Sequence, residues 1–248
     1  MLRGKHVLIT GGGGGPGAAI AHGMASQAAS TDLVDIDQST LTQQEESLRN
    51  EGYDVTGQVL DISDLKAVND FAKQFTINCN GLDVPVNNTR IAAQANFDTN
   101  ETVEVQNKII AVNLQGAFNV FLAFVPALKK KKGNVIKLCP VSCFGSGGSK
   151  TAYIVFKRAI HFLTQALVQN FAPHGIRVSA VASGVITSNI GLVLMNRRRG
   201  ADGFINRFMP GCLSKVAEVV PPVIFLPSSM TSYIVETILP VDADFLAA

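Results

Sequence analysis

The sequence predicts an α/β fold built on one doubly wound parallel sheet with helices on both faces. Predicted strands and helices alternate along the whole chain, no shift in composition divides it, and a glycine-rich turn joins the first strand to the first helix. The 248 residues are 47% hydrophobic and only 16% charged, which suits a parallel sheet covered on both faces. We therefore expect residues 1–248 to form a single domain.

Short apolar segments predict the strands, and the longer segments between them predict the helices. The predicted strands are residues 5–10, 31–37, 55–60, 81–89, 133–138, 176–182 and 234–241. The predicted helices are residues 18–25, 39–50, a helix that starts near 63, and then 101–132, 151–172 and 216–226.

Local signals define several of these elements. Ser63 is predicted to cap the third helix, because its hydroxyl can accept a hydrogen bond from a backbone N–H of the first turn. Pro85 is unusual in a central strand, because proline removes a donor from the ladder. Pro126 predicts a kink in the long helix. Pro221 and Pro222 predict that the last helix is broken or shortened.

Composition excludes several classes of protein. The formal charge of +2 gives no reason to expect a nucleic-acid partner. The four cysteines (Cys79, Cys139, Cys143 and Cys212) have no metal-ligand spacing, so we expect no metal site and reduced thiols. The chain enters a strand almost at once, without a signal-peptide pattern or an apolar run long enough to span a bilayer. We therefore expect a cytoplasmic protein without a membrane partner.

The turn Thr10-Gly11-x-x-x-Gly15-x-Gly17 lies between a predicted strand and a predicted helix. This is the context that a dinucleotide fingerprint requires, because glycines let the backbone approach a pyrophosphate and the helix N-terminus favours its negative charge. A flexible glycine-rich turn is the simpler alternative. Pro16 lacks an N–H, which removes one donor that a phosphate would otherwise use.

Asp35 ends the second predicted strand, 18 residues after Gly17. An acid at about this spacing hydrogen-bonds the ribose hydroxyls of a dinucleotide. Its charge repels a ribose phosphate, so Asp35 predicts NAD (NADH) as the cofactor and makes NADP less favourable.

Tyr153 and Lys157 lie four residues apart on a predicted helix that runs to the region of Pro173. Side chains four apart share one helix face, so the Lys157 ammonium is expected near the Tyr153 phenol. A nearby cation favours the phenolate, which would let Tyr153 exchange a proton with an alcohol or carbonyl near neutral pH. A core tyrosine beside a solvated lysine is the alternative.

Taken together, these motifs resemble the short-chain dehydrogenase/reductase family over essentially the whole length of the chain. The motifs that carry the resemblance are the loop from Thr10 to Gly17, Asp35, Asp61-Ile62, Asn87-Asn88, Asn113, Tyr153 with Lys157, and Leu239-Pro240-Val241-Asp242. The resemblance implies a Rossmann-type fold and hydride transfer between a nicotinamide and an alcohol or carbonyl.

The resemblance also implies roles for individual residues. Tyr153 would be the general acid/base, Lys157 would lower its pKa and hold the nicotinamide ribose, and Asn113 would position a relay water. The residues implied to contact the cofactor are Thr10, Gly11, Gly15, Gly17, Asp35, Asp61, Ile62, Asn87, Lys157, Gly184 and Ser188.

The sequence departs from the family pattern around the implied active site. The family's catalytic serine falls at Pro140, which cannot donate a hydrogen bond to a substrate oxygen. Ser142 is the candidate substitute, because it would share the side of Pro140 if the strand stayed extended. Arg90 stands where the family keeps a small residue near the cofactor.

Two functions therefore remain open. The first is an NAD-dependent oxidoreductase for a small alcohol or ketone, with residues 183–211 as a substrate lid and Tyr153 as general acid/base. The second is a divergent, weakly active or non-catalytic relative that binds a nucleotide or a protein partner. Loss of one donor costs roughly 10²–10³ in rate, which favours a slow enzyme over an inactive one. The resemblance implies a homodimer or homotetramer.

Overall fold

The structure is a computed structural model that describes residues 1–91, 102–144, 151–187, 209–210 and 212–246. Side chains are described over the same ranges except at residues 102, 151–157, 160 and 161. The predicted lid, residues 183–211, falls mostly outside the described part of the chain.

Seven parallel strands form one sheet in the order β3-β2-β1-β4-β5-β6-β7. The strands are β1 (His6–Thr10), β2 (Ser30–Asp35), β3 (Val55–Val59), β4 (Val84–Asn87), β5 (Asn134–Pro140), β6 (Arg177–Ser183) and β7 (Ile238–Val241). The strand order reverses between β1 and β4, where two halves of the sheet meet. The prediction of a doubly wound parallel sheet is confirmed.

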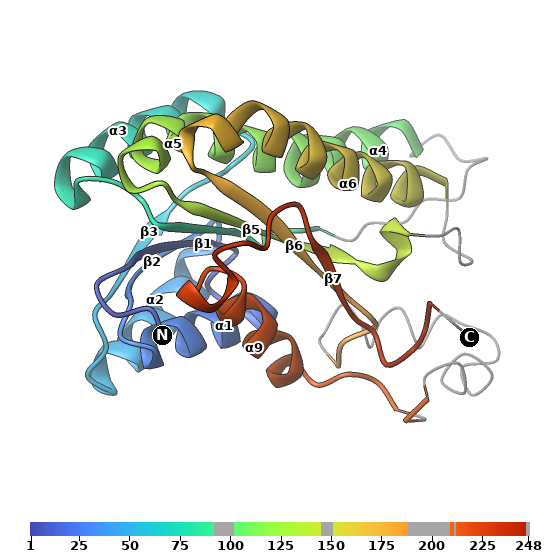
Figure 1. The fold of residues 1–248 in the computed structure, drawn as a ribbon, viewed down its shortest axis with the longest axis horizontal. Helices are drawn as coiled ribbons and strands as arrows, with labels where there is room; N and C mark the ends of the chain where they lie inside the picture. The colour runs from blue at the N-terminus through green and yellow to red at the C-terminus, as the bar shows by residue number, and fades with distance from the viewer. Residues whose placement is uncertain (92–101, 145–150, 188–208, 211, 247–248) are drawn as a thin grey trace.

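Helices cover both faces of this sheet (Figure 1). One face carries α3 (Leu65–Cys79), α4 (Thr102–Ile109), α5 (Ala117–Lys131) and α6 (Thr151–Phe171). The other face carries α1 (Gly15–Ser26), α2 (Gln38–Asn50) and α9 (Val216–Phe225). Each layer buries its own apolar cluster against the sheet, with Leu33 on one face and Leu8 on the other.

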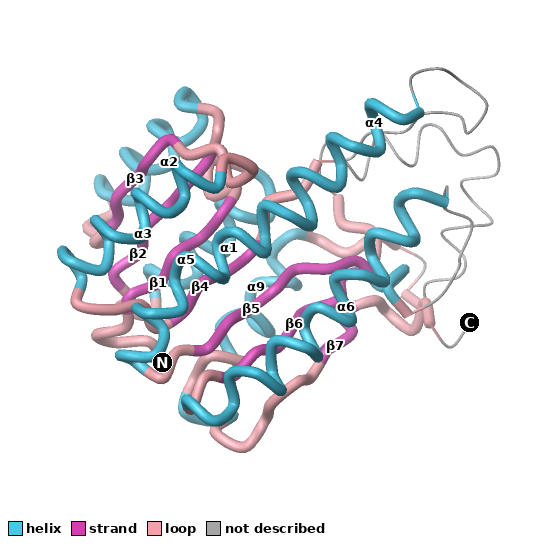
Figure 2. The backbone as a smooth tube through the Cα atoms, turned by 90° about the horizontal axis from the view of Figure 1, so that it is seen from above, coloured by secondary structure: helices cyan, strands magenta, loops and turns pink. Residues whose placement is uncertain are grey.

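The helix predicted over residues 101–132 is one long rod in Figure 2, but its regular hydrogen bonding is interrupted. Between α4 and α5, the segment Ile110–Gly116 is a π-helix. The irregularity therefore lies around Asn113, whereas α5 continues through Pro126, where the sequence had predicted a kink. Single π-helical turns within α-helices occur frequently at functional sites.

The same rod, Val103–Lys131, spans 29 residues and is long and apolar enough to cross a membrane by length and composition. This length and composition correct the expectation that the sequence has no apolar run long enough to span a bilayer. Its apolar character has a structural explanation, because Phe121 and Phe124 are fully buried in the layer between the helix and the sheet.

Two local predictions need correction, and the unusual Pro85 has an explanation. The N-cap of α3 is Asp64, whose carboxylate accepts from the N–H groups of Lys66 and Ala67, while Ser63 bonds to another carboxylate. Helix α9 is unbroken, with both prolines inside it. Pro85 does lie in a central strand, but the ladder of β4 with β5 begins only at the next residue, so its missing N–H interrupts little pairing.

Candidate active site

The glycine loop leaves the carboxyl end of β1 and leads into α1, as predicted. Gly11 has φ +66°, a conformation that residues with a Cβ rarely adopt. A Cβ on Gly17 would lie 1.9 Å from the carbonyl oxygen of Gly11, so only glycine fits there. Helix α1 begins at Gly15, with Pro16 in its first turn, where proline is tolerated. The loop therefore forms the close backbone cradle that a pyrophosphate needs.

Thr10 and Asn88 hold this loop against the end of β4. The Thr10 hydroxyl accepts hydrogen bonds from the backbone N–H groups of Asn88 and Thr89, each at 3.1 Å. The Asn88 side-chain amide donates in return to the carbonyls of Thr10 and Gly11, at 3.0 and 3.1 Å. The sequence analysis assigned a site role to Thr10 but none to Asn88. In the structure both of these side chains shape the loop.

Asp35 ends β2 beside the same loop. Its Oδ2 accepts a hydrogen bond from the N–H of Gly13 at 3.0 Å, and its Oδ1 accepts from the N–H of Asp37 at 3.2 Å. The side chain is half-buried. An acid held at this strand end is placed as the sequence predicted for a residue that recognises a ribose.

Asp61 and Ile62 follow β3, the strand next to β2. The Asp61 carboxylate accepts from both the N–H and the hydroxyl of Ser63, at 2.8 and 2.7 Å, and remains exposed. Ile62 is buried against Gly116, where a Cβ would come within 2.7 Å of its side chain. Asp61 and Ile62 therefore lie at the same edge of the sheet as Asp35, with the carboxylate of Asp61 facing solvent.

Asn87 and Asn113 are both buried near the carboxyl end of β4. The Asn87 amide donates to the carbonyl of Ala117 at 3.2 Å, and its Oδ1 has no hydrogen-bond partner within the described residues. Asn113 accepts from the N–H of Ile91 at 2.8 Å and donates to the Ile91 carbonyl at 3.0 Å. A buried acceptor without a partner is costly unless a ligand or water completes it, so Asn87 is suited to contact a bound molecule.

Strand β5 ends at Pro140, and residues Val141–Cys143 form a 3-10 turn. The premise that the strand stays extended as far as Ser142 is therefore wrong. The Ser142 Oγ is nevertheless buried without a hydrogen-bond partner within the described residues. The Ser142 hydroxyl thus has unused hydrogen-bonding capacity, and it lies two residues beyond the position that the family pattern implies.

Tyr153 and Lys157 lie four residues apart in the first turns of α6, as predicted, and their side chains are outside the described part. Helix α6 packs against both the π-helix that holds Asn113 and the 3-10 turn that holds Ser142. The helix that carries Tyr153 and Lys157 therefore contacts the two segments that carry Asn113 and Ser142.

Of the remaining residues that the sequence singled out, Gly184 follows β6 and Arg90 follows β4. The N–H of Gly184 donates to the carbonyl of Val241 at 2.9 Å, which fixes the turn after the strand. Ser188 lies outside the described residues. Arg90 is half-buried, directly before the residue that Asn113 binds.

Lys137 is a residue of this region that the sequence analysis did not single out. It is 1% exposed in β5, pairs in register with Asn87, and its Nζ has no hydrogen-bond partner within the described residues. Burial lowers its pKa to about 7. A lysine inside an apolar strand pattern was the available signal, because charged residues are rarely fully buried.

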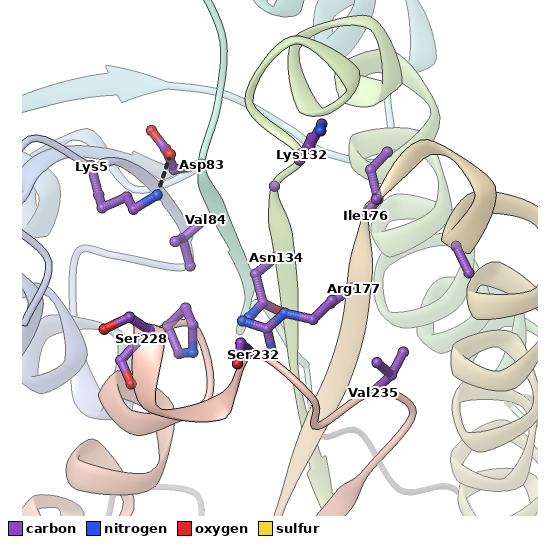
Figure 3. A pocket seen from close by; sticks show the side chains of 15 residues that line it. Lys5, Asp83, Val84, Lys132, Asn134, Ile176, Arg177, Ser228, Ser232 and Val235 are labelled. Carbon is purple, nitrogen blue, oxygen red and sulfur yellow. Dashed lines mark hydrogen bonds and ion pairs between the residues drawn. The ribbon is translucent and has the colours of Figure 1, made fainter.

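A cavity of about 420 Å³ lies at the opposite edge of the sheet. Figure 3 shows Lys5, Asp83, Asn134 and Arg177 around it. Arg177 donates to the carbonyls of the segment after α9, including Thr231 at 2.9 Å and Ile234 at 2.9 Å. This cavity is formed by the amino-terminal ends of strands, so it is separate from the edge that holds the glycine loop.

The chain is similar in sequence to known reductases and dehydrogenases over nearly its whole length. Levodione reductase from Leifsonia aquatica is 29% identical over 254 residues, which cover 98% of this chain and 94% of the relative. The 2-dehydro-3-deoxy-D-gluconate 5-dehydrogenase of Bacillus subtilis is 29% identical over 249 residues, which cover 99% and 96%.

Solved structures agree with the sequence relatives. The crystal structure of a gluconate 5-dehydrogenase from Burkholderia cenocepacia, in complex with NADP and tartrate, superimposes with a TM-score of 0.93 at 26% identity and covers 100% of this chain and 97% of that chain. The model of the family described as short chain dehydrogenase matches residues 5–196. The sheet order, the glycine loop and these matches agree, and the chain therefore belongs to the short-chain dehydrogenase family.

Proposed function

We propose that this protein is an NAD-dependent oxidoreductase that transfers a hydride between the nicotinamide and a small alcohol or carbonyl compound. The proposal is supported by the glycine loop and Asp35 at the carboxyl ends of β1 and β2, and by the packing of α6, which carries Tyr153, against the segments of Asn113 and Ser142. Named relatives support the class of reaction, because they are a reductase and dehydrogenases.

The residues of the site fit an adenine dinucleotide. The cradle has no space for a side chain at Gly17, where a Cβ would overlap the Gly11 carbonyl oxygen, and the Asn87 Oδ1 lacks a partner within the described residues. Asp35 favours NAD, because its carboxylate would lie against a ribose phosphate. The gluconate 5-dehydrogenase structure contains NADP, so the preference for NAD rests on Asp35 alone.

When bound, the cofactor donates or accepts the hydride. Tyr153 exchanges the proton with the substrate oxygen, and Lys157, one turn further along α6, stabilises its phenolate. Ser142 donates a hydrogen bond to the same oxygen. Asn113 uses one donor and one acceptor on Ile91, which leaves one N–H and one lone pair for a relay water.

A homodimer or homotetramer is part of the proposal, because the family resemblance pairs the helices that carry Asn113 and Tyr153. Phe162 on α6 is 63% exposed and Leu122 on α5 is 43% exposed, which leaves apolar surface on these helices. Phe121 is buried in the core and is therefore excluded from such an interface. Sedimentation of the purified chain tests this assembly. The cytoplasmic location stays a prediction.

The first experiment is a titration of the purified chain with NADH and with NADPH, followed by nicotinamide fluorescence. The proposal expects saturable NADH binding that is tighter than NADPH binding. Turnover is then screened with small ketones and polyols. Tyr153→Phe should lower kcat by at least about 10²-fold with an unchanged dissociation constant for NADH. The control Tyr233→Phe changes a side chain that is 99% exposed and should leave both constants unchanged.

A binding protein without turnover is the second candidate. Pro140 favours it, because it replaces a hydroxyl donor with a residue that cannot donate. Tight NADH binding without turnover of any substrate would support this second candidate. Equal turnover by the wild type and Tyr153→Phe would disprove the assigned role of Tyr153.

A further inference from the structure

Three potential metal ligands meet at the amino-terminal edge of the sheet. They are the imidazole of His6 on β1, the carboxylate of Asp32 on β2 and the thiol of Cys79, the last residue of α3. One ligand atom from each lies within 4.8 Å of the other two. Asp32 pairs in register with Leu8, whose side chain lies on the face of the sheet that α3 covers. His6 precedes Leu8 by two residues, so the side chains of His6 and Asp32 lie on that same face.

The His6 imidazole has a nitrogen that a cation can use. The His6 Nδ1 is buried and has no hydrogen-bond partner within the described residues. A buried nitrogen acceptor without a partner is costly, so a bound cation would satisfy this nitrogen. The same cation would stabilise the anionic forms of Asp32 and Cys79, its two other candidate ligands.

We propose that His6, Asp32 and Cys79 bind one zinc ion. Imidazole nitrogen, carboxylate oxygen and thiolate sulfur are the ligand types of zinc, whereas magnesium and calcium prefer oxygen ligands alone. Tetrahedral zinc places its ligand atoms about 3.5 Å apart, and the three candidate ligand atoms lie within 4.8 Å of one another before any metal is bound. Water completes the fourth position of such a site.

The proposed site is separate from the reaction. His6 is the first residue of β1, whereas the glycine loop follows the last residue of that strand. Zinc would tie the carboxyl end of α3 to the first two strands and thereby stabilise the fold. Cysteine spacing predicted no metal because the three ligands are far apart in sequence and only the sheet brings them together.

Zinc content and affinity test the proposal. The untagged chain is dialysed against buffered zinc, and bound zinc is measured by mass spectrometry. We expect about one zinc per chain, and His6→Gln, Asp32→Asn and Cys79→Ser should each weaken binding by more than about 100-fold, since even the loss of an outer partner costs 10–100-fold. The matched controls are His22→Gln, Asp70→Asn and Cys212→Ser. They make the same three substitutions at residues that lie outside the proposed site. These controls should bind zinc as the wild type does.

Cobalt(II) provides a readout that does not depend on the stability of the ligand variants. In the Cys212→Ser chain, cobalt should give a thiolate-to-metal charge-transfer band and tetrahedral visible bands. Zinc should also raise the melting temperature of this chain. Absence of the thiolate band, less than stoichiometric zinc, or loss of zinc in Cys212→Ser but not in Cys79→Ser would overturn the proposal. NADH binding serves as the folding control for every variant.

Discussion

The carboxylate of Asp35 accepts a hydrogen bond from the backbone N–H of Gly13 at 3.0 Å, which ties the end of β2 to the glycine loop. Removing the charge of Asp35 should therefore affect both the loop and the ribose contact. We expect Asp35→Asn to weaken NADH binding by about 10- to 100-fold, because hydrogen bonds to charged groups contribute about 1.5–3 kcal/mol. The variant should also lose its discrimination against NADPH. Fluorescence titrations with both nucleotides measure these changes.

Asp37→Asn is the matched control for this prediction. Asp37 is exposed two residues further along and caps α2 through the N–H groups of Ser39 and Thr40. Its loss should change stability slightly without altering the ratio of NADH to NADPH affinity. An Asp35→Asn protein that keeps the wild-type ratio would contradict the role assigned to Asp35.

A second prediction concerns the contact between Gly17 and Gly11. Gly17→Ala should abolish NADH binding, because the added Cβ would overlap the Gly11 carbonyl oxygen and force the loop apart. Gly14→Ala is the control, because a Cβ there meets no atom within 4 Å and Gly14 has an extended φ of −162°. Each variant adds one methyl group to the wild type, and the two positions are three residues apart. Wild-type affinity in Gly17→Ala would show that the nucleotide does not use this loop.

The sequence predicted the sheet well, because a parallel sheet buried on both faces produces recognisable apolar strands between helices. The sequence also placed the glycine loop at the end of β1 and Asp35 at the end of β2. Both could be predicted because the acid of a dinucleotide site follows the glycine loop at a nearly fixed spacing in the sequence.

Features that depend on long-range packing could not be predicted. The π-helix around Asn113 leaves no sequence signal, and a side chain as ordinary as Asn88 becomes important only when β4 lies beside β1. Ser142 was misplaced because the sequence does not show where strand pairing ends. Lys137 is the exception, since its position in an apolar run was visible and its burial could have been inferred.

A third prediction concerns the missing donor of the active site. If the Ser142 hydroxyl binds the substrate oxygen, Ser142→Ala should lower kcat by roughly 10²-fold, with little change in NADH affinity. Pro140→Ser restores a hydroxyl at the end of β5 and should raise kcat in the same assay. Steady-state kinetics with the substrate found in the screen measure both effects. An unchanged kcat in Ser142→Ala, together with a gain in Pro140→Ser, would show that Ser142 is not the substitute.

The last prediction concerns the buried Lys137. Its pKa of about 7 in the folded chain lies well below the ordinary 10.5. Between these two values the unfolded chain binds a proton that the folded chain does not, so stability should rise with pH, by up to about 1.4 kcal/mol per pH unit. Below pH of about 7 the folded chain is protonated as well and the penalty stays constant. Lys137→Met keeps a similar length without the charge, so it should stabilise the protein most at and below a pH of about 7.

Urea denaturation at several pH values between about 7 and about 10 tests this sign. The difference in free energy of unfolding between Lys137→Met and the wild type should shrink steadily as the pH rises. Lys130→Met is the control, because Lys130 is exposed in the last turn of α5 and its replacement should give a difference that hardly varies with pH. A Lys137→Met difference that is flat over this range would mean that the Lys137 amine keeps its proton in the folded chain, which would contradict its lowered pKa.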